Sequence, residues 1–347
     1  MSLNFAVIFG GVSYEHEISI VSAITLKKLL PNLKEFIFID AVRDLYLIPA
    51  QKMNVKHFSS GAYKSNPRVE IKKGGLYVKG FLGAKRLLAD VYINLIHGGD
   101  GEDGKLAGIF EFFSIPVIGP RLEASVLSFN KHLTKLYAKE RGIKTLPYLI
   151  ASLKERRELG KEFPMIVKPL RLGSSIGVSV VKNQSELAYA LDVAYEFDES
   201  ALVEPFIAGV KEYNLAGCKI HDEYHFSIAE EPKKGDFLDF EKKYLDFSDT
   251  KEREKAPISS ALLNHLKEAF RKLYEGTFEG SIIRCDFFVL EGEVFLNEIN
   301  PIPGSLANYL FEDFPALLES LAHTLPSARE IPIDYHYIHQ IQHAKGK

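Results

Sequence analysis

Two short segments near the end of the chain constrain its fold more than any other part of the sequence. Residues 280–290 and 294–300 are rich in Ile, Val and Phe, and a short Glu-Gly-Glu link joins them. This pattern predicts a β-hairpin. Because side chains alternate along a strand, one face of each strand carries the polar residues. Those faces consist of Arg284, Asp286 and Phe288 on the first strand and of Leu296, Glu298 and Asn300 on the second.

The length of the link sets the register of this hairpin. A three-residue loop at 291–293 places Leu290 opposite Val294. Asp286 then faces Glu298, with Cβ atoms roughly 4.5–5.5 Å apart. By the same count Phe288 faces Leu296 and Arg284 faces Asn300. A slip of one residue would move the acids to opposite faces.

Two facing carboxylates repel each other unless a cation lies between them. The oxygens of Asp286, Glu298 and Asn300 form a hard ligand set that suits Mg²⁺, which commonly shares its coordination with nucleotide phosphates. We therefore predict a magnesium site on this face. The competing interpretation is a solvated outer face of an edge hairpin, where alternating charges are ordinary.

The composition is that of a soluble globular protein of two or three domains. The 347 residues include 43 basic and 46 acidic residues, so no basic surface for nucleic acid is expected. The two cysteines, Cys218 and Cys285, indicate neither a disulfide framework nor a thiolate metal site. We expect no signal peptide and no membrane span, because the apolar run at 5–9 is one strand long. These features favour a reducing cytoplasm.

The first third of the chain begins as α/β domains do. A buried strand at 5–9 leads through a glycine loop into a helix at 18–30, and a second strand follows at 36–39. Residues 45–82 suggest short strands and turns without helical period. The loop carries Glu15 and Glu17, which either cap the helix or hold a cationic group such as an amine.

A second glycine loop follows the buried strand at 91–96. It contains His97 and three acids, and Asp103 is placed to cap the next helix. His97 lies at the carboxyl end of its strand, where α/β proteins build sites, although a lone histidine is more often structural. The alternation of predicted strands, loops and helices changes near Gly119, which we take as the first domain boundary.

The middle of the chain predicts a helix at 130–141, a hairpin and a second helix at 183–197. The hairpin runs from 163 to 181, and its Gly-Ser-Ser tip beside Lys168 predicts an anion-binding loop, although most glycine-rich tips merely turn. Residues 201–207 form a strand cut by Pro205, which we interpret as an exposed edge or a linker.

The last domain begins near residue 209 with a strand at 212–218. The highly charged segment 233–255 predicts a lid, or else a solvated linker. An amphipathic helix follows at 259–275. The His-rich tail at 335–347 predicts a frayed surface and no metal site.

Taken together and in this order, these segments resemble the D-alanine–D-alanine ligases of the ATP-grasp superfamily. The most specific motifs are His-Gly-x-x-Gly-Glu-Asp-Gly from His97, Arg-x-Asp from Arg284, and Glu-x-Asn-x-x-Pro-Gly from Glu298. The resemblance spans nearly the whole chain. It implies an α/β, three-domain ATP-grasp architecture with a Rossmann-like N-terminal domain at 1–119, a central domain at 120–208 and a C-terminal domain at 209–347.

The resemblance also implies a reaction. ATP phosphorylates one D-alanine, and the amine of a second attacks the acyl phosphate to give D-alanyl-D-alanine for peptidoglycan synthesis. The family implies two Mg²⁺ ions, with Mn²⁺ as an alternative, and a homodimer. The implied metal ligands are Asp286, Glu298 and Asn300. The implied nucleotide ligands are Lys131, Lys168, Ser175, Glu204, Phe206, Ile207, Glu212, Lys243 and Asn297.

The remaining implied roles concern the amino acids. Glu15 and His97 would line the first D-alanine site, and Arg284 with the N–H of Gly304 would form the oxyanion hole. Ser174 and Tyr244 would orient the substrates and help to remove the proton of the attacking amine. Ser305 and Tyr309 would lie at the second substrate.

The chain departs from many relatives at Pro301, where they have Thr or Ser, and at Tyr309, where a serine is common. Tyr244 favours amide synthesis, because relatives that make D-alanyl-D-lactate lack this tyrosine. The alternatives are a D-alanyl-D-lactate ligase, another ATP-grasp carboxylate–amine ligase, or a catalytically inactive nucleotide-binding protein.

Overall fold

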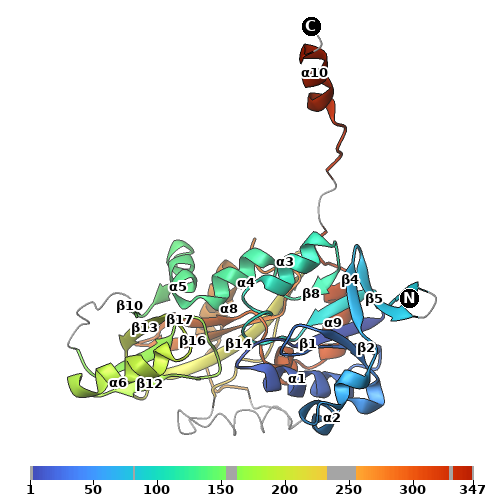
Figure 1. Ribbon diagram of the computed structural model, residues 1–347. Coiled ribbons are helices and arrows are strands. Elements are labelled where there is room, and N and C mark those ends of the chain that lie inside the picture. Colours follow the sequence, from blue (N-terminus) through green and yellow to red (C-terminus); the bar gives the residue numbers. More distant parts are fainter. Residues whose placement is uncertain (1–2, 81–82, 154–161, 233–254, 328–330, 346–347) are drawn as a thin grey trace.

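The computed structural model describes residues 3–80, 83–153, 162–232, 255–327 and 331–345. Within these ranges the strands form four sheets, and helices pack on them (Figure 1). No described helix combines the length and the apolarity that crossing a bilayer would require. The expected segment 233–255 lies outside the described residues, apart from its last residue.

The first sheet has the strand order β3-β2-β1-β7-β8. Its inner strands pair in parallel and are continuously apolar, because both faces of the sheet are buried. A small sheet of order β4-β5-β6 is formed by the part of the chain between β3 and β7. The elements of this part are β1 Phe5–Gly10, α1 His16–Leu29, β2 Leu33–Ile39, β3 Leu45–Ile48, η1 Ala50–Lys52, α2 Val55–Ser59, η2 Ala62–Ser65, β4 Val69–Lys72, β5 Gly75–Gly80, β6 Gly83–Arg86, β7 Val91–Asn94, α3 Lys105–Phe112 and β8 Val117–Ile118.

Two predictions for this part were wrong in detail. The stretch 45–82 contains the one-turn helix α2, whose N-cap Asn54 accepts a hydrogen bond from the backbone of His57. The N-cap of α3 is Gly104 rather than Asp103, because a φ of 92° there suits glycine. The Asp103 carboxylate still accepts the N–H of Lys105.

The second sheet has the order β10-β13-β11-β12 and is covered by α6. The prediction that 201–207 is an edge or a linker was wrong, because β13 lies between β10 and β11 with Ala201 to Glu204 buried. Pro205 is the last residue of β13, so its missing N–H interrupts little of the ladder. The elements here are β10 Leu149–Ser152, β11 Met165–Pro169, β12 Ser179–Val181, α6 Gln184–Tyr195 and β13 Ser200–Pro205.

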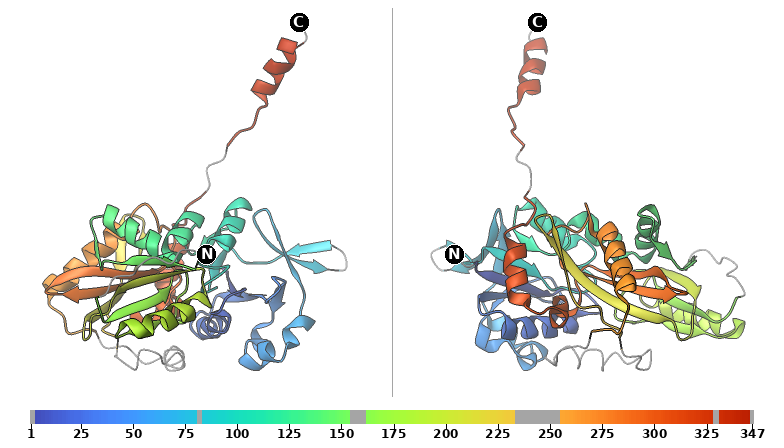
Figure 2. Two further views of the ribbon diagram at one scale, coloured as in Figure 1. Left: turned by 60° about the vertical axis from the view of Figure 1, so that its left-hand side comes forward. Right: turned by 180° about the vertical axis from the view of Figure 1, so that it is seen from behind.

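The third sheet has the order β15-β14-β16-β17-β9, and α8 and α9 pack against β14 on the side seen from behind in Figure 2. In α8 the stripe of Leu266, Phe270 and Leu273 is fully buried, as its helical spacing predicts. The elements are α4 Leu122–Phe129, α5 Lys131–Glu140, β9 Lys144–Thr145, β14 Lys211–Ile220, β15 Glu223–Phe226, α8 Ser260–Tyr274, β16 Ile283–Leu290, β17 Glu293–Asn300, η3 Gly304–Leu310 and α9 Phe314–Ala322.

Two segments differ from what the sequence suggests, one in its packing partner and one in its conformation. The helices α4 and α5 and the strand β9 contact β17, although they precede the second sheet in the chain. The tail is not frayed: it forms the helix α10, His336–Lys345, which projects away from the body in every view (Figures 1 and 2). The division into domains at 119 and 208 stays a prediction.

Candidate active site

The hairpin of β16 and β17 brings its acids together, but its turn length and strand register differ from the predicted ones. The turn has two residues, Glu291 and Gly292, so Leu290 pairs with Glu293 and not with Val294. Both turn residues have positive φ, 52° and 82°, as a type I′ turn requires. Phe288 accordingly pairs with Phe295 and not with Leu296.

A β-bulge then restores the predicted register. It lies between Phe287, which pairs with Leu296, and Asp286, which pairs with Glu298. Asn297 is the extra residue on the bulged strand. Arg284 therefore faces Asn300, as predicted.

Asp286 is the centre of a buried polar cluster. Arg284 donates to both of its oxygens, from Nε at 2.7 Å and from Nη2 at 2.8 Å, and the Asn300 amide donates to it at 3.0 Å. Burial raises the pKa of Asp286, the arginine opposes this, and Glu298, which hydrogen-bonds Asp286, raises the pKa further. The bidentate Arg284–Asp286 pair was not predicted.

Glu212 of β14 borders the same cluster. It pairs with Phe288 across the strands. Burial raises its pKa to about 7, and Asp286 and Glu298 add to the rise. Three carboxyl groups thus face a region where negative charge is costly, which is the environment that a cation relieves. The described residues contain no group of three or more His, Cys, Asp or Glu side chains with metal-site geometry, so a metal here also needs the amide oxygen of Asn300, water or substrate oxygens.

A second cluster joins the second and third sheets. Lys168 at the end of β11 donates to Glu204 at 2.5 Å and to Asn297 at 3.3 Å. Sequence reasoning missed the fourth member, Lys135, whose Nζ lies 2.9 Å from Glu204 and whose side chain is only 3% exposed. Its spacing of four residues from Lys131 on α5 was an available signal. The pKa of Glu204 is lowered by these lysines despite its burial.

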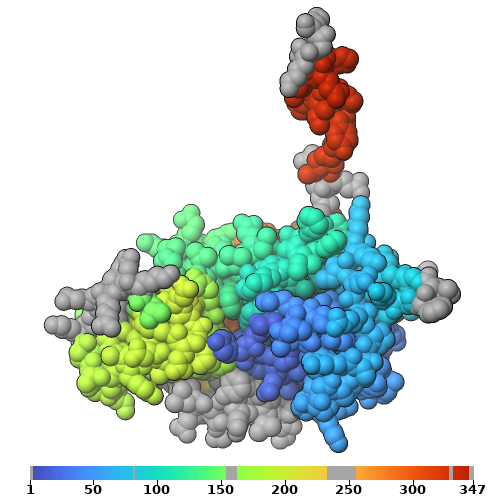
Figure 3. Space-filling view, viewed as in Figure 1, coloured from blue at the N-terminus to red at the C-terminus, as the bar shows by residue number. Residues whose placement is uncertain are grey.

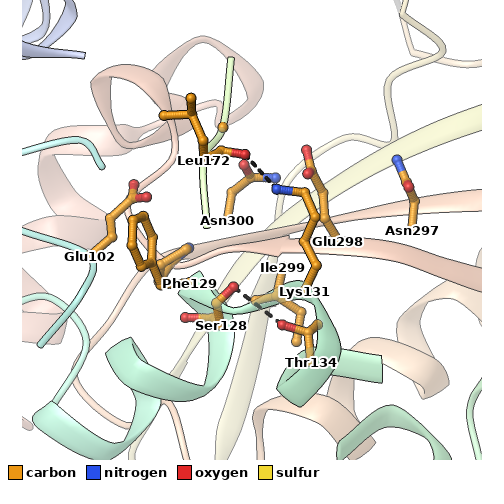
Figure 4. A pocket seen from close by; sticks show the side chains of 12 residues that line it. Glu102, Ser128, Phe129, Lys131, Thr134, Leu172, Asn297, Glu298, Ile299 and Asn300 are labelled. Atoms are coloured by element: carbon orange, nitrogen blue, oxygen red, sulfur yellow. Dashed lines mark hydrogen bonds between the residues drawn. The ribbon is translucent and has the colours of Figure 1, made fainter. Parts of the chain in front are cut away.

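Between the two clusters lies a small cavity of about 30 Å³ that opens to solvent. Lys131 reaches into it and donates to the carbonyl of Leu172 at 2.5 Å, and Figure 4 shows its ammonium group beside Glu298 and Asn300. Its negative neighbours include Glu298, Glu15 and Glu204. The cavity therefore combines Lys131 with two acids, Glu298 of the hairpin and Glu102 of the N-terminal segment.

Glu15 approaches the serine loop from the N-terminal segment. Ser174 donates a hydrogen bond to Glu15, and a Cβ at Gly98 would lie 2.7 Å from the same carboxylate, so only glycine fits there. Burial raises the pKa of Glu15 to about 7, with a contribution from Glu102. Figure 3 shows the yellow-green surface of the α6 region against the dark blue surface of this segment, where Tyr14 contacts Phe197.

His97 interacts electrostatically with Glu15 and is 4% exposed. Its Nε2 is 3.0 Å from Ser22 Oγ, and its Nδ1 is 3.8 Å from Glu102. Burial raises the pKa of Glu102 to about 8. Neither Ser22 nor Glu102 was predicted as a site residue, although Glu102 lies inside the motif that begins at His97.

The turn after β17 has an unusual backbone. Ser305, Leu306 and Ala307 all have left-handed φ, between 49° and 54°. Each such residue costs about 1–2 kcal/mol, so the surrounding packing must stabilise the turn. Gly304 opens it, Ser305 is buried, and Tyr309 lies near the Arg284 guanidinium.

The other predicted residues fall into two groups. Ser175 lies in the loop with a φ of 59°, and Phe206 and Ile207 follow β13, with the N–H of Phe206 donating to Pro164 at 2.9 Å. Lys243 and Tyr244 lie outside the described residues.

Two family descriptions match the chain. "D-ala D-ala ligase N-terminus" matches residues 4–120, and "D-ala D-ala ligase C-terminus" matches residues 140–315. The chain is 70% identical to a D-alanine–D-alanine ligase of Wolinella succinogenes over 345 residues, covering 99% of this chain and all of the relative. It is 56% identical to that of Campylobacter jejuni serotype O:2, with the same coverage.

A solved structure agrees with these sequence matches. The crystal structure of the D-alanine–D-alanine ligase from Helicobacter pylori superposes with a TM-score of 0.85 at 53% identity. The match covers 94% of this chain and 100% of that one. The expected ATP-grasp architecture is thereby confirmed.

Proposed function

Since this chain belongs to the family of D-alanine–D-alanine ligases, we propose that its cavity activates one D-alanine with ATP and joins it to a second. The chain is an enzyme that ligates D-alanine to D-alanine, and ATP is its co-substrate. The observation that carries this function is the 70% identity to a D-alanine–D-alanine ligase across 99% of the chain. The product serves peptidoglycan precursor synthesis.

Different residues bind the different parts of the nucleotide and its metal ions. Lys168 and Lys131 bind phosphate oxygens together with the backbone of Ser175, and Glu212 binds the ribose. Glu204, Phe206, Ile207 and Asn297 surround the base and its neighbours. Lys135 neutralises Glu204, so that Lys168 can turn toward phosphate. Asp286, Glu298 and Asn300 would hold two Mg²⁺ ions, because Asp286 and Glu298 face each other across the hairpin beside Asn300 and burial raises the pKa of Asp286. Bound Mg²⁺ supplies charge neutralisation to the transferred phosphoryl group.

The amino-acid residues act on the opposite side of the cavity. The Glu15 carboxylate binds the ammonium group of the first D-alanine, while His97 borders its pocket. The carboxylate of this first D-alanine takes the γ-phosphoryl group of ATP, giving an acyl phosphate and ADP. The amine of the second D-alanine then attacks the carbonyl carbon, and the oxyanion is stabilised by Arg284 and the N–H of Gly304. Ser305 and Tyr309 border the second substrate.

Two proton and bond changes complete the reaction. The attacking amine loses a proton, for which Ser174 is placed by its hydrogen bond to Glu15. Tyr244 is the second candidate for this transfer. Phosphate then leaves as the tetrahedral intermediate collapses to the dipeptide. Lys243 and Tyr244 belong to the segment 233–255, whose role as a lid stays a prediction.

Phosphate release in the presence of D-alanine tests the overall proposal. Purified protein with ATP, Mg²⁺ and D-alanine should release phosphate and D-alanyl-D-alanine in equal amounts. A parallel reaction near neutral pH with D-lactate should give no ester. Turnover with D-lactate would make the chain a D-alanyl-D-lactate ligase, and ATP binding without turnover would support an inactive nucleotide-binding protein.

The activity should depend on pH through Glu15. Its pKa of about 7 means that the carboxyl is neutral below that pH and cannot pair with an ammonium group. We expect kcat/KM for D-alanine to rise between pH 6 and pH 8, roughly the range in which such a group titrates. The Ser174 hydrogen bond lowers this pKa, so Ser174→Ala should move the midpoint upward.

The control for this shift is Ser185→Ala, at an exposed helix N-terminus where the hydroxyl donates to Asn183. Its pH profile should match that of the unmodified protein. A midpoint that stays in place or falls in Ser174→Ala would contradict the assignment of Glu15.

We also propose that the enzyme works in the cytoplasm as a homodimer. ATP as a substrate supports the location. Exposed apolar side chains on neighbouring helices support the dimer, since they offer a surface to a second copy. They are Phe112, Leu122, Val126 and Leu136, exposed at 82%, 44%, 44% and 47%.

A further inference from the structure

One buried pair, Ser22 and His97, holds the turn after β17 from both sides. The N–H of Ser305 donates to Ser22 Oγ at 3.2 Å, and the backbone of Ile302 faces the His97 ring closely enough to raise its pKa. Ser22 Oγ lies 3.0 Å from Nε2 of that ring. The two contacts flank Gly304, so the pair and the turn form a closed ring of polar contacts around it.

The polarity of this ring is consistent with a neutral histidine. Burial lowers the pKa of His97, so the ring carries a single N–H near neutral pH. Because Ser22 Oγ already accepts from Ser305, its hydroxyl proton can go to Nε2, and the ring N–H is then left for the backbone of Ile302. Ser22 and His97 are 3% and 4% exposed, so water does not compete for these bonds.

The turn needs such support because its backbone is strained. Three consecutive residues without glycine's freedom, from Ser305 to Ala307, are left-handed. Conformations of this kind persist only where the surroundings hold them. η3 has no side-chain hydrogen bond at its N-cap, so the N–H of Ser305 depends on Ser22 of α1.

We propose that Ser22 is a positioning residue that, with His97, holds the N–H of Gly304 at the oxyanion position. The inference rests on the proposed role of Gly304. Ser22 and His97 come from the N-terminal segment, and Gly304 follows the hairpin of the third sheet. We call the pair of Ser22 and His97 the clamp. The clamp completes the oxyanion hole only when these two parts of the chain are in contact.

Ser22→Ala should lower kcat roughly 10- to 10²-fold, the effect of a small misplacement at a reacting centre. KM for ATP should stay near its original value. A phosphinate analogue of the dipeptide, whose tetrahedral oxygen imitates the oxyanion, should bind more weakly by a similar factor. Ser22→Thr keeps the hydroxyl and should recover most of both losses.

Ser19→Ala is the matched control on the same helix. Ser19 is fully buried, and its hydroxyl donates to Leu95 and accepts from Gly10 rather than from the turn. It should lower Tm without lowering kcat. Unchanged kcat in Ser22→Ala, or an equal loss of kcat in Ser19→Ala, would overturn the clamp. If Arg284→Ala also retains full kcat, the oxyanion site itself is wrong; if only Arg284→Ala loses it, the clamp alone is wrong.

Discussion

Replacing Arg284 with alanine should reduce kcat roughly 10²–10³-fold, the loss typical of one oxyanion-hole donor. KM for ATP should change little, because the lysines that bind phosphate lie on other elements. The guanidinium is 14% exposed and already held by two bonds to Asp286, so it is pre-oriented before any substrate arrives. Release of ADP at saturating ATP and D-alanine measures the effect.

The same pair complicates the alanine variant, since it leaves a buried Asp286 without its cation. Arg284→Lys separates the two effects: it keeps the charge but cannot form two parallel N–H bonds. We expect a smaller loss of stability and a kcat between those of the alanine variant and the original enzyme. Arg68→Ala removes an exposed arginine that pairs with Asp44 and should leave kcat unchanged. Normal turnover in Arg284→Ala would reject the assigned role.

Glu298→Gln should produce the second large effect. The change preserves shape but removes one of the two charges that face each other across the hairpin. Lewis-acid stabilisation is worth several kcal/mol, so kcat should fall by roughly 10²-fold or more. The Mg²⁺ concentration for half-maximal activity should rise in parallel, because the remaining ligands bind the ion less tightly. A titration of initial rates with Mg²⁺ measures both.

Glu293→Gln is the control on the same strand. Glu293 pairs with Lys144 at 2.6 Å on the exposed side of β17, so its loss should affect neither kcat nor the Mg²⁺ dependence. An unaltered Mg²⁺ dependence in Glu298→Gln would mean that this hairpin does not hold the metal.

The hairpin also shows where local reasoning succeeds and where it fails. Alternation correctly predicted that Asp286 faces Glu298, but the turn was predicted one residue too long. The bulge at Asn297 compensates for this error. Asn297 contacts Lys168, which is 129 residues away, and no local pattern contains that contact.

Other misses have the same origin. Pro205 suggested an edge strand, yet β13 is internal because the proline falls on its last residue. Ser22 occupies a buried face of α1 that looks like ordinary core in sequence, and its partners lie 75 and 283 residues away. The spacing of Lys135 from Lys131 places the two on one face of α5, but its partner Glu204 is 69 residues away in the chain.

Hydrophobic periodicity and glycine placement were sufficient to predict most strands and helices, the glycine loops and the acid-bearing face, and the motifs identified the family. Those signals depend on residues close together in the chain, whose geometry is set by the backbone. Which side chains meet was decided by the packing of three sheets: Ser174 against Glu15, Lys135 against Glu204, and Ser22 against both His97 and the turn. Such contacts join segments that are distant in sequence, so bulges, turn lengths and packing angles determine them.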